Sequence, residues 1–183
     1  MEKLQKPAIL VVDMLNDFVT GALACDRGKA IVSPTASLLD AARKAGVPVI
    51  FCNDAHIKGI DRELKLWGDH AMAGTEGAAV IPELNVCDKD LIVPKRRYSG
   101  FFHTDLDILL KELGVQTVVM TGLHTHMCVR HTSADAYCLG YDVVVAKDAT
   151  NSFTEQDYLY GLDYLKTCYG AEAYSNDELI AMF

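Results

Sequence analysis

The sequence predicts an α/β protein in which helices cover both faces of one open, mostly parallel β-sheet. Short apolar runs rich in β-branched residues recur along the chain without polar alternation, which is typical of strands buried on both faces. Segments with helical spacing lie between these runs. This alternation of strand and helix favours a parallel sheet between two helical layers.

The first strand is expected where five apolar residues follow Pro7. Four further apolar runs have the same character, and a short last strand is expected close to the end of the chain. The expected strands are residues 8–12, 47–52, 91–93, 117–121, 143–145 and 171–174.

Glycine commonly ends a helix because it adopts a left-handed conformation without steric cost. Gly46, Gly114 and Gly140 each follow directly on a segment with helical spacing, and Gly170 lies just beyond another. The expected helices are residues 34–45, 104–113, 128–139, 156–168 and 176–183.

Residues 53–77 form the least regular part of the sequence and are rich in Asp, His and Gly. A loop of this length inside a compact domain is usually functional or disordered. It follows the carboxyl end of an expected strand, which is where open α/β sheets bind ligands. We therefore expect this loop to contribute to a ligand site.

Composition limits the classes of partner. A chain of 183 residues, half of them hydrophobic, predicts a single domain over residues 1–183. The net charge of −8 gives no attraction to nucleic acid or anionic lipid, and no apolar run is long enough to span a membrane. Six cysteines without CxxC spacing favour a reducing compartment, so we expect a cytoplasmic protein without nucleic-acid or membrane partners.

Cys128 is the first candidate catalytic residue. It lies in the segment 122–132, which joins an expected strand to an expected helix, and this places the sulfur at a helix N-terminus. Backbone N–H groups there stabilise a thiolate and bind an oxyanion. A buried structural cysteine is the alternative that residue type alone favours.

Asp13 and Lys95 each follow an apolar strand, and the carboxyl ends of parallel strands meet in one crevice. Asp13 is expected to act as general base toward the thiol of Cys128 and then to protonate the leaving amine. Lys95 is expected to lower the pKa of the thiol and to hold Asp13 by an ion pair. Taken singly, Asp13 is equally well interpreted as a cap and Lys95 as a surface lysine.

At these residues the sequence resembles the isochorismatase-like cysteine hydrolases, a superfamily that includes nicotinamidases and N-carbamoylsarcosine amidohydrolases. The resemblance extends over nearly the whole chain. The segments that carry it are residues 12–18, 54–56, 67–70, 95–101 and 122–132.

The resemblance implies a three-layer Rossmann-like fold with a mostly parallel five- or six-stranded sheet and a triad of Asp13, Lys95 and Cys128. It also implies a cis peptide between Leu123 and His124, with backbone N–H groups of His124 and Cys128 forming an oxyanion hole. Isochorismatases themselves lack the cysteine, so Cys128 favours the amidase branch, which releases ammonia through a thioester. Family members often assemble as dimers or tetramers, which implies a homo-oligomer.

Asp54, His56 and His70 are the candidate metal ligands. Asp54 and His56 are two residues apart and share one side of an extended segment. Two imidazoles and a carboxylate suit Zn²⁺, Fe²⁺ or Mn²⁺, although spacing alone also fits two surface histidines in a polar loop. Nicotinamidases carry a divalent metal at corresponding places, so the resemblance implies a divalent metal, with Zn²⁺ the expected ion.

Phe18, Trp67 and Tyr98 match the aromatic residues that surround the substrate ring in nicotinamidases. Core packing is the ordinary role of such residues. The chain departs from the nicotinamidase pattern at Leu15, where glutamine is usual, and at His126 and Met127 before the cysteine. Asp61 and Glu63 are the nearby spare carboxylates in the loop.

The departures leave two substrate hypotheses for a cysteine hydrolase. The first is nicotinamide, converted to nicotinate, and the second is another small amide, ureido or carbamoyl compound. A nucleotide- or flavin-binding domain is a third hypothesis, but neither GxGxxG nor a P-loop follows the first strand. A non-catalytic interaction module is the fourth, and the intact Asp13, Lys95 and Cys128 set argues against it.

Overall fold

A computed structural model describes residues 2–183. Strands and helices alternate along the described chain, as expected. The strands are β1 (Pro7–Val12), β2 (Val49–Asp54), β3 (Leu91–Lys95), β4 (Thr117–Leu123), β5 (Asp142–Asn151) and β6 (Glu172–Tyr174). The helices are α1 (Asn16–Val19), α2 (Asp26–Ala30), α3 (Val32–Ala45), α4 (Leu64–Trp67), α5 (Leu106–Glu112), α6 (Arg130–Cys138), α7 (Glu155–Tyr169) and α8 (Asn176–Met182), with short helical turns η1 (Glu76–Ala78), η2 (Pro82–Leu84) and η3 (Thr125–Val129).

Among residues 2–183, six parallel strands form one sheet in the order β3-β2-β1-β4-β5-β6. This confirms the predicted α/β class and the mostly parallel sheet. From β1 the chain adds β2 and then β3 on one side. It then crosses to the other side of β1 and adds β4, β5 and β6 in turn, so the direction of strand addition reverses between β1 and β4. Open sheets of this kind bind ligands beside such a reversal, at the carboxyl ends of the strands.

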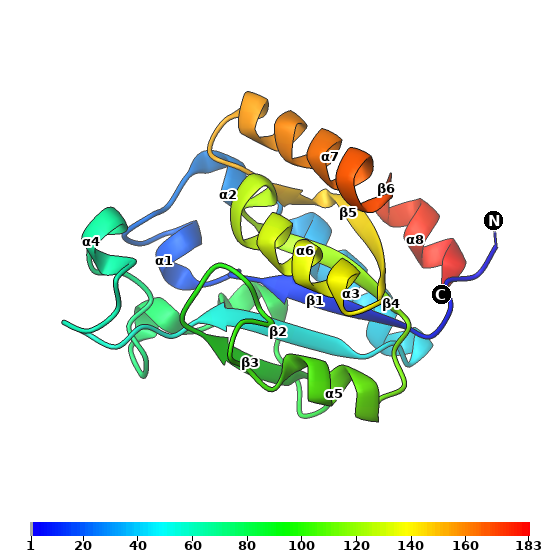
Figure 1. Cartoon of the computed structure of the whole chain (residues 1–183), viewed down its shortest axis with the longest axis horizontal. Helices are drawn as coiled ribbons and strands as arrows, with labels where there is room; N and C mark the ends of the chain where they lie inside the picture. The colour runs from blue at the N-terminus through cyan, green and yellow to red at the C-terminus, as the bar shows by residue number, and fades with distance from the viewer. Residues whose placement is uncertain (1) are drawn as a thin grey trace.

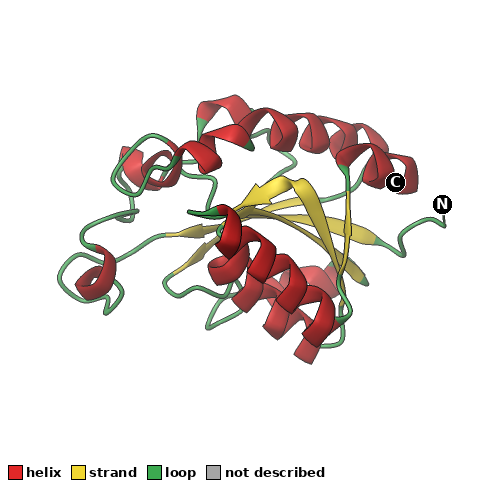
Figure 2. Cartoon of the chain, turned by 90° about the horizontal axis from the view of Figure 1, so that it is seen from above, coloured by secondary structure: helices red, strands yellow, loops and turns green. Residues whose placement is uncertain are grey.

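Helices cover both faces of the sheet, which gives three layers (Figures 1 and 2). The side chains of β1 alternate between two cores, because successive strand residues point to opposite faces. Ile9 and Val11 pack with α3 and α8, whereas Leu10 and Val12 pack with α5, α6 and α7. Burial on both faces explains why the strand sequences lack polar alternation.

The expected strands and helices were found with shifted ends. β5 continues to Asn151, six residues beyond the expected end, and the short helices α1 and α2 were not expected. The helix expected to begin at Cys128 was placed wrongly: a π-helical turn covers Thr125–Val129, and the regular helix α6 begins at Arg130. Cys128 therefore lies inside a wide turn and not at the first position of α6.

Within residues 2–183, no helix is both long and apolar enough to cross a membrane.

Candidate active site

The sheet brings the three expected catalytic residues to one edge. Asp13 directly follows β1, Lys95 is the last residue of β3, and Cys128 lies in η3 just after β4. Asp54, the last residue of β2, is paired in register with Lys95. Parallel strands therefore deliver all four side chains to the carboxyl edge of the sheet.

Lys95 forms ion pairs with two carboxylates. Its Nζ lies 2.8 Å from Oδ2 of Asp13 and 2.6 Å from Oδ1 of Asp54, and all three side chains are buried. The backbone N–H of Asp54 donates to Oδ1 of Asp13 at 2.8 Å. One ligand atom from each of Asp13, Asp54 and Cys128 lies within 4.8 Å of the other two. The carboxylate of Asp13 therefore has one oxygen fixed by the backbone and one next to the cation and the thiol.

Burial sets the protonation of these groups. Burial and the negative charge of Asp54 raise the pKa of Asp13 to about 6, against the opposing effect of Lys95. Burial opposes the charge of Lys95, but Asp13 and Asp54 outweigh it and raise the pKa of the ammonium. Near neutral pH, Asp13 is thus an ionised carboxylate with the pKa of an effective general base.

The expected lowering of the pKa of Cys128 was wrong. Burial raises the pKa of this thiol well above its ordinary value, and the carboxylates of Asp13 and Asp54 add to the effect of burial. Lys95 acts in the opposite direction and does not compensate. The resting residue is therefore a neutral thiol, which needs a base beside it before it can attack.

Gly122 allows the close approach of β4 and β1 at this edge. It has a φ of 94°, and a Cβ atom there would lie 2.0 Å from the carbonyl oxygen of Val12. No other residue fits such a position. The peptide bond between Leu123 and His124 is cis, as the resemblance implied.

The three expected metal ligands also come together. Asp54, His56 and His70 are buried, and one ligand atom of each lies within 4.8 Å of the other two. Nδ1 of His70 donates to the carbonyl oxygen of Gly68 at 2.9 Å, and Nδ1 of His56 lies 3.1 Å from Asp61. Partners of this kind fix the tautomer of metal-binding histidines and leave Nε2 free for the ion.

The surroundings of Nε2 of His56 indicate that a cation fits between the expected metal ligands. This atom is buried without a hydrogen-bond partner among the described residues, 3.6 Å from Oδ2 of Asp54 and 4.0 Å from Oε2 of Glu63. An unpartnered buried nitrogen facing two carboxylates is costly unless an ion or a proton lies between them. The donor set of imidazoles and carboxylates therefore suits a divalent metal such as zinc.

Glu63 and Asp61 were recognised in the sequence only as spare carboxylates. Glu63 lines the same cavity as Cys128, where burial and the charge of Asp54 raise its pKa to about 7. Asp61 is buried beneath His56 and receives hydrogen bonds from the guanidinium of Arg96 and from the backbone N–H of Ile57. Arg96 thus holds an anion in place behind His56.

Replacing Asp61 with asparagine is expected to weaken the affinity of this cluster for a divalent metal, with zinc as the probe, about 10–100-fold, because the supporting carboxylate of His56 is lost. Competition with a chromophoric chelator measures the affinity. Asp90→Asn is the matched control. It also removes a carboxylate paired with an arginine, Arg43, but Asp90 lies at the amino-terminal end of β3, away from the cluster. Equal zinc affinity in Asp61→Asn and the unmodified protein would contradict the role of Asp61.

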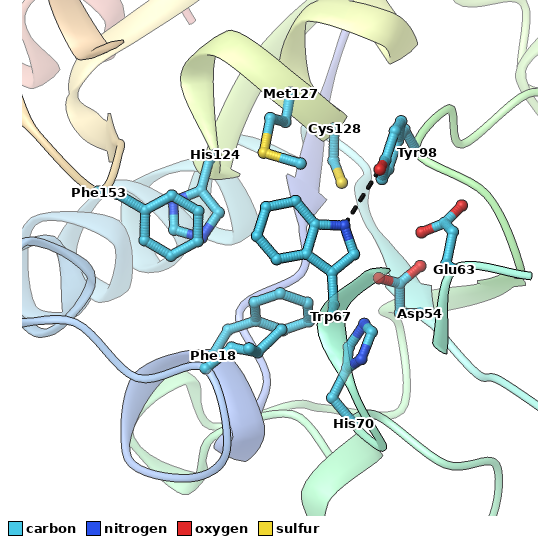
Figure 3. Close-up of a pocket in the computed structure, with 11 residues that line it drawn as sticks. Phe18, Asp54, Glu63, Trp67, His70, Tyr98, His124, Met127, Cys128 and Phe153 are labelled. Carbon is cyan, nitrogen blue, oxygen red and sulfur yellow. Dashed lines mark hydrogen bonds between the residues drawn. The ribbon is translucent and has the colours of Figure 1, made fainter. Parts of the chain in front are cut away.

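Aromatic side chains line a small, partly open cavity beside Cys128. In Figure 3 the indole of Trp67 lies in the middle of the view, and its N–H donates to the hydroxyl of Tyr98 at 3.1 Å. The ring of Phe153 stacks on His124 and lies nearly parallel to Trp67. The residues that line the cavity are Phe18, Leu23, Asp54, Glu63, Trp67, His70, Tyr98, His124, Met127, Cys128 and Phe153.

The sequence predicted Phe18, Trp67 and Tyr98 at this cavity, and the structure brings all three there. It did not predict Phe153, which lies two residues after β5. The signal was present, since a residue just past a central parallel strand reaches the same edge as Asp13 and Lys95. The expected end of the strand at residue 145 concealed it.

Comparison with known proteins identifies the family. Residues 7–177 match the isochorismatase domain, which covers more than nine-tenths of the chain. The chain belongs to the isochorismatase family. The recognition made from the sequence motifs is thereby confirmed.

Solved structures of isochorismatase-family proteins superpose closely on this one. An isochorismatase-like hydrolase from Alkaliphilus metalliredigens has a TM-score of 0.92 and 40% identity, over 97% of this chain and 98% of the other. An N-carbamoylsarcosine amidase from Thermoplasma acidophilum has a TM-score of 0.89 and 38% identity, over 94% and 98%. A pyrazinamidase from Pyrococcus horikoshii, solved in complex with zinc, has a TM-score of 0.86 and 28% identity, over 93% and 99%.

A curated relative in the isochorismatase family, nicotinamidase 3 from Arabidopsis thaliana, is 32% identical over 88% of this chain and 84% of its own length. The family thus includes relatives named for different small amides.

Proposed function

We propose that this protein hydrolyses the C–N bond of a small amide, with Cys128 as nucleophile, and releases ammonia. The juxtaposition of Asp13, Lys95 and Cys128 carries this proposal. A base with a pKa near 6 stands beside a neutral thiol, and a buried cation keeps the base ionised. The amidases among the family relatives support the same chemistry.

In the first half of the reaction, Asp13 accepts the proton of the thiol as sulfur attacks the amide carbon. The carbonyl π electrons move to oxygen, and the backbone N–H groups of His124 and Cys128 are proposed to stabilise that oxyanion. When the tetrahedral intermediate collapses, the C–N bond breaks and Asp13 gives its proton to the departing nitrogen. Ammonia leaves, and the acyl group remains on Cys128 as a thioester.

In the second half, water replaces ammonia. Asp13 accepts a proton from this water as its oxygen attacks the thioester carbon. Collapse of the second intermediate breaks the C–S bond, and the sulfur regains a proton from Asp13. The products are a carboxylic acid, or a carbamic acid from a ureido substrate, and the regenerated thiol. Lys95 keeps its charge throughout and holds Asp13 in place.

Zinc held by Asp54, His56 and His70 would supply a Lewis-acidic position for a neutral substrate atom, such as the ring nitrogen of a pyridine. Phe18, Trp67 and Tyr98 would enclose the ring of such a substrate. These features support nicotinamide as the first candidate substrate, with nicotinate as its product.

A carbamoyl or ureido compound is the second candidate. The 38% identity to an N-carbamoylsarcosine amidase supports it, because structural superposition gives 31% identity to a nicotinamidase from Bacillus subtilis. Both candidates require the same nucleophile and differ in the group attached to the scissile amide.

Ammonia release tests both candidates at once. We expect the purified, zinc-loaded protein to release ammonia from nicotinamide, from an N-carbamoyl amino acid, or from both, and Cys128→Ala to release it far more slowly. Mass spectrometry of the intact protein during turnover is expected to detect an acyl adduct on the unmodified chain. Absence of ammonia release from all small amides and ureas would refute the proposed hydrolysis.

The value of kcat/KM is expected to fall at acidic pH, about tenfold for each pH unit below 6. Asp13 must be ionised to accept the thiol proton, and protonation below its pKa of about 6 removes the base. Ammonia release measured at several pH values gives this acidic limb of the pH profile, the range in which kcat/KM falls. The limb is expected to disappear in Asp13→Asn, in which the amide oxygen keeps the hydrogen bond from the backbone of Asp54 but no base remains. A flat profile across this pH range would contradict the assignment of Asp13 as base.

A further inference from the structure

His124 differs from its neighbours in the cavity because its side chain has no polar partner. The imidazole is 2% exposed, and neither ring nitrogen has a hydrogen-bond partner among residues 2–183. It lines the cavity above Cys128 and stacks on Phe153 with 3.8 Å between ring centroids (Figure 3). Both ring nitrogens therefore lie buried at the border of the cavity without a protein group to satisfy them.

Other histidines of the chain show what a satisfied imidazole looks like here. In four of these five, all but the exposed His103, Nδ1 lies within hydrogen-bond distance of another protein atom. These pairs are His56 with Asp61, His70 with Gly68, His126 with Ser152, and His131 with Met127. Buried polar groups are nearly always paired, so an unpaired imidazole facing a cavity indicates a partner that enters with a ligand.

The protonation of His124 defines what it recognises. Burial, with a smaller contribution from His126, lowers its pKa to about 3, although Asp157 acts in the opposite direction. The ring is therefore neutral at physiological pH and offers one N–H donor and one nitrogen acceptor. Such a ring suits a neutral polar group and gives no ion pair to a carboxylate.

The position of His124 separates it from the metal cluster. In Figure 3 His124 and Phe153 lie on one side of the cavity and Asp54 on the other, with Trp67 and Cys128 between them. A substrate whose carbonyl carbon approaches Cys128 can therefore present a second polar group to the side that holds His124.

We propose that His124 is a specificity-determining residue, which hydrogen-bonds a second, neutral nitrogen group of the substrate beside the scissile amide. A ureido N–H would donate to its acceptor nitrogen, on the side of the cavity away from the metal cluster. The inference rests on the proposed amide hydrolysis and narrows its substrate class. Amides with this second group are preferred over purely aliphatic or benzenoid amides, because only the former satisfy the imidazole.

Two pairs of nearly isosteric compounds test this preference. Methylurea and propionamide differ by N–H against CH₂. Nicotinamide and benzamide, which differ by N against CH at the position assigned to the metal cluster, form the control pair. The unmodified protein is expected to favour methylurea over propionamide by about 10–100-fold in kcat/KM. The other member of each pair serves as the reference for size and shape.

His124→Phe removes both ring nitrogens and keeps a planar ring against Phe153. We expect this variant to lose the preference, so that the ratio of kcat/KM for methylurea to kcat/KM for propionamide falls by about 10–100-fold. His124→Gln, which retains an amide donor and acceptor, is expected to recover part of the preference.

Thermal unfolding separates recognition from a structural role. His124→Phe is expected to unfold at the same or a higher temperature, because it removes two unsatisfied buried nitrogens. His126→Phe is the matched control: it leaves the buried hydroxyl of Ser152 without its ring partner and is expected to unfold at a lower temperature. A lower unfolding temperature in His124→Phe, or a substrate preference that survives the substitution, would overturn the assignment.

Ligand-induced stabilisation keeps this test apart from the test of hydrolysis. If the unmodified protein releases no ammonia, yet methylurea raises its unfolding temperature and the rise is lost in His124→Phe, hydrolysis is refuted and the role of His124 stands. If none of the four compounds is hydrolysed or raises the unfolding temperature, the role of His124 is refuted as well.

Discussion

Replacing Cys128 with alanine is expected to reduce kcat for amide hydrolysis by a factor on the order of 10⁵. The thiol provides the atom that bonds to the acyl carbon in the first half-reaction and leaves it in the second. Among residues 2–183, the only other sulfur that lines the cavity is the thioether of Met127, which has no proton to give. Residual activity would come from binding and from the oxyanion hole alone. Ammonia release under single-turnover conditions measures the loss.

Cys138→Ala is the matched control for this experiment. Cys138 ends α6, the helix that follows the turn containing Cys128, and its side chain is exposed. We expect full activity in Cys138→Ala and an unchanged unfolding temperature in both variants. Residual activity of Cys128→Ala within tenfold of the unmodified protein would mean that another group attacks the amide.

The sequence predicted the order of strands and helices well because buried parallel strands carry a strong signal. Runs such as residues 8–12 are apolar on both faces and are hard to confuse with a surface strand. The strand ends were less well predicted. β5 continues through Lys147 and Asp148, which are exposed, so its polar second half lacks the pattern that identified its first half.

The candidate site was predicted to the extent that residues follow directly on strands. Asp13, Lys95 and Asp54 lie at strand ends, and parallel topology alone brings them together. The pKa of Cys128 was predicted in the wrong direction, because the helix N-terminus was expected to outweigh burial and burial depends on tertiary packing. The unpaired state of His124 was also beyond the sequence, since an absent hydrogen bond follows only from the positions of all its neighbours.

Lys95→Met is expected to have the largest effect on stability, a loss of about 3–5 kcal/mol in the free energy of unfolding near neutral pH. The substitution leaves Asp13 and Asp54 buried beside each other without their shared cation. The pKa of Asp13 then rises further, because Lys95 is the main group that lowers it. Amide hydrolysis at neutral pH is expected to be lost, since Asp13 is protonated and cannot act as base.

The sign of the pH dependence makes this prediction specific. In Lys95→Met the folded carboxylates bind protons more tightly than the unfolded ones, so the free energy of unfolding should rise as the pH falls through their raised pKa values. Urea unfolding at several pH values measures this pH dependence.

Lys111→Met is the matched control: Lys111 pairs with Asp107 at 2.6 Å, the same distance as Lys95 with Asp54, but its side chain is 61% exposed. We expect a loss below about 1 kcal/mol there, because water screens an exposed pair. Equal losses in the two variants would mean that the buried charges are already compensated without Lys95.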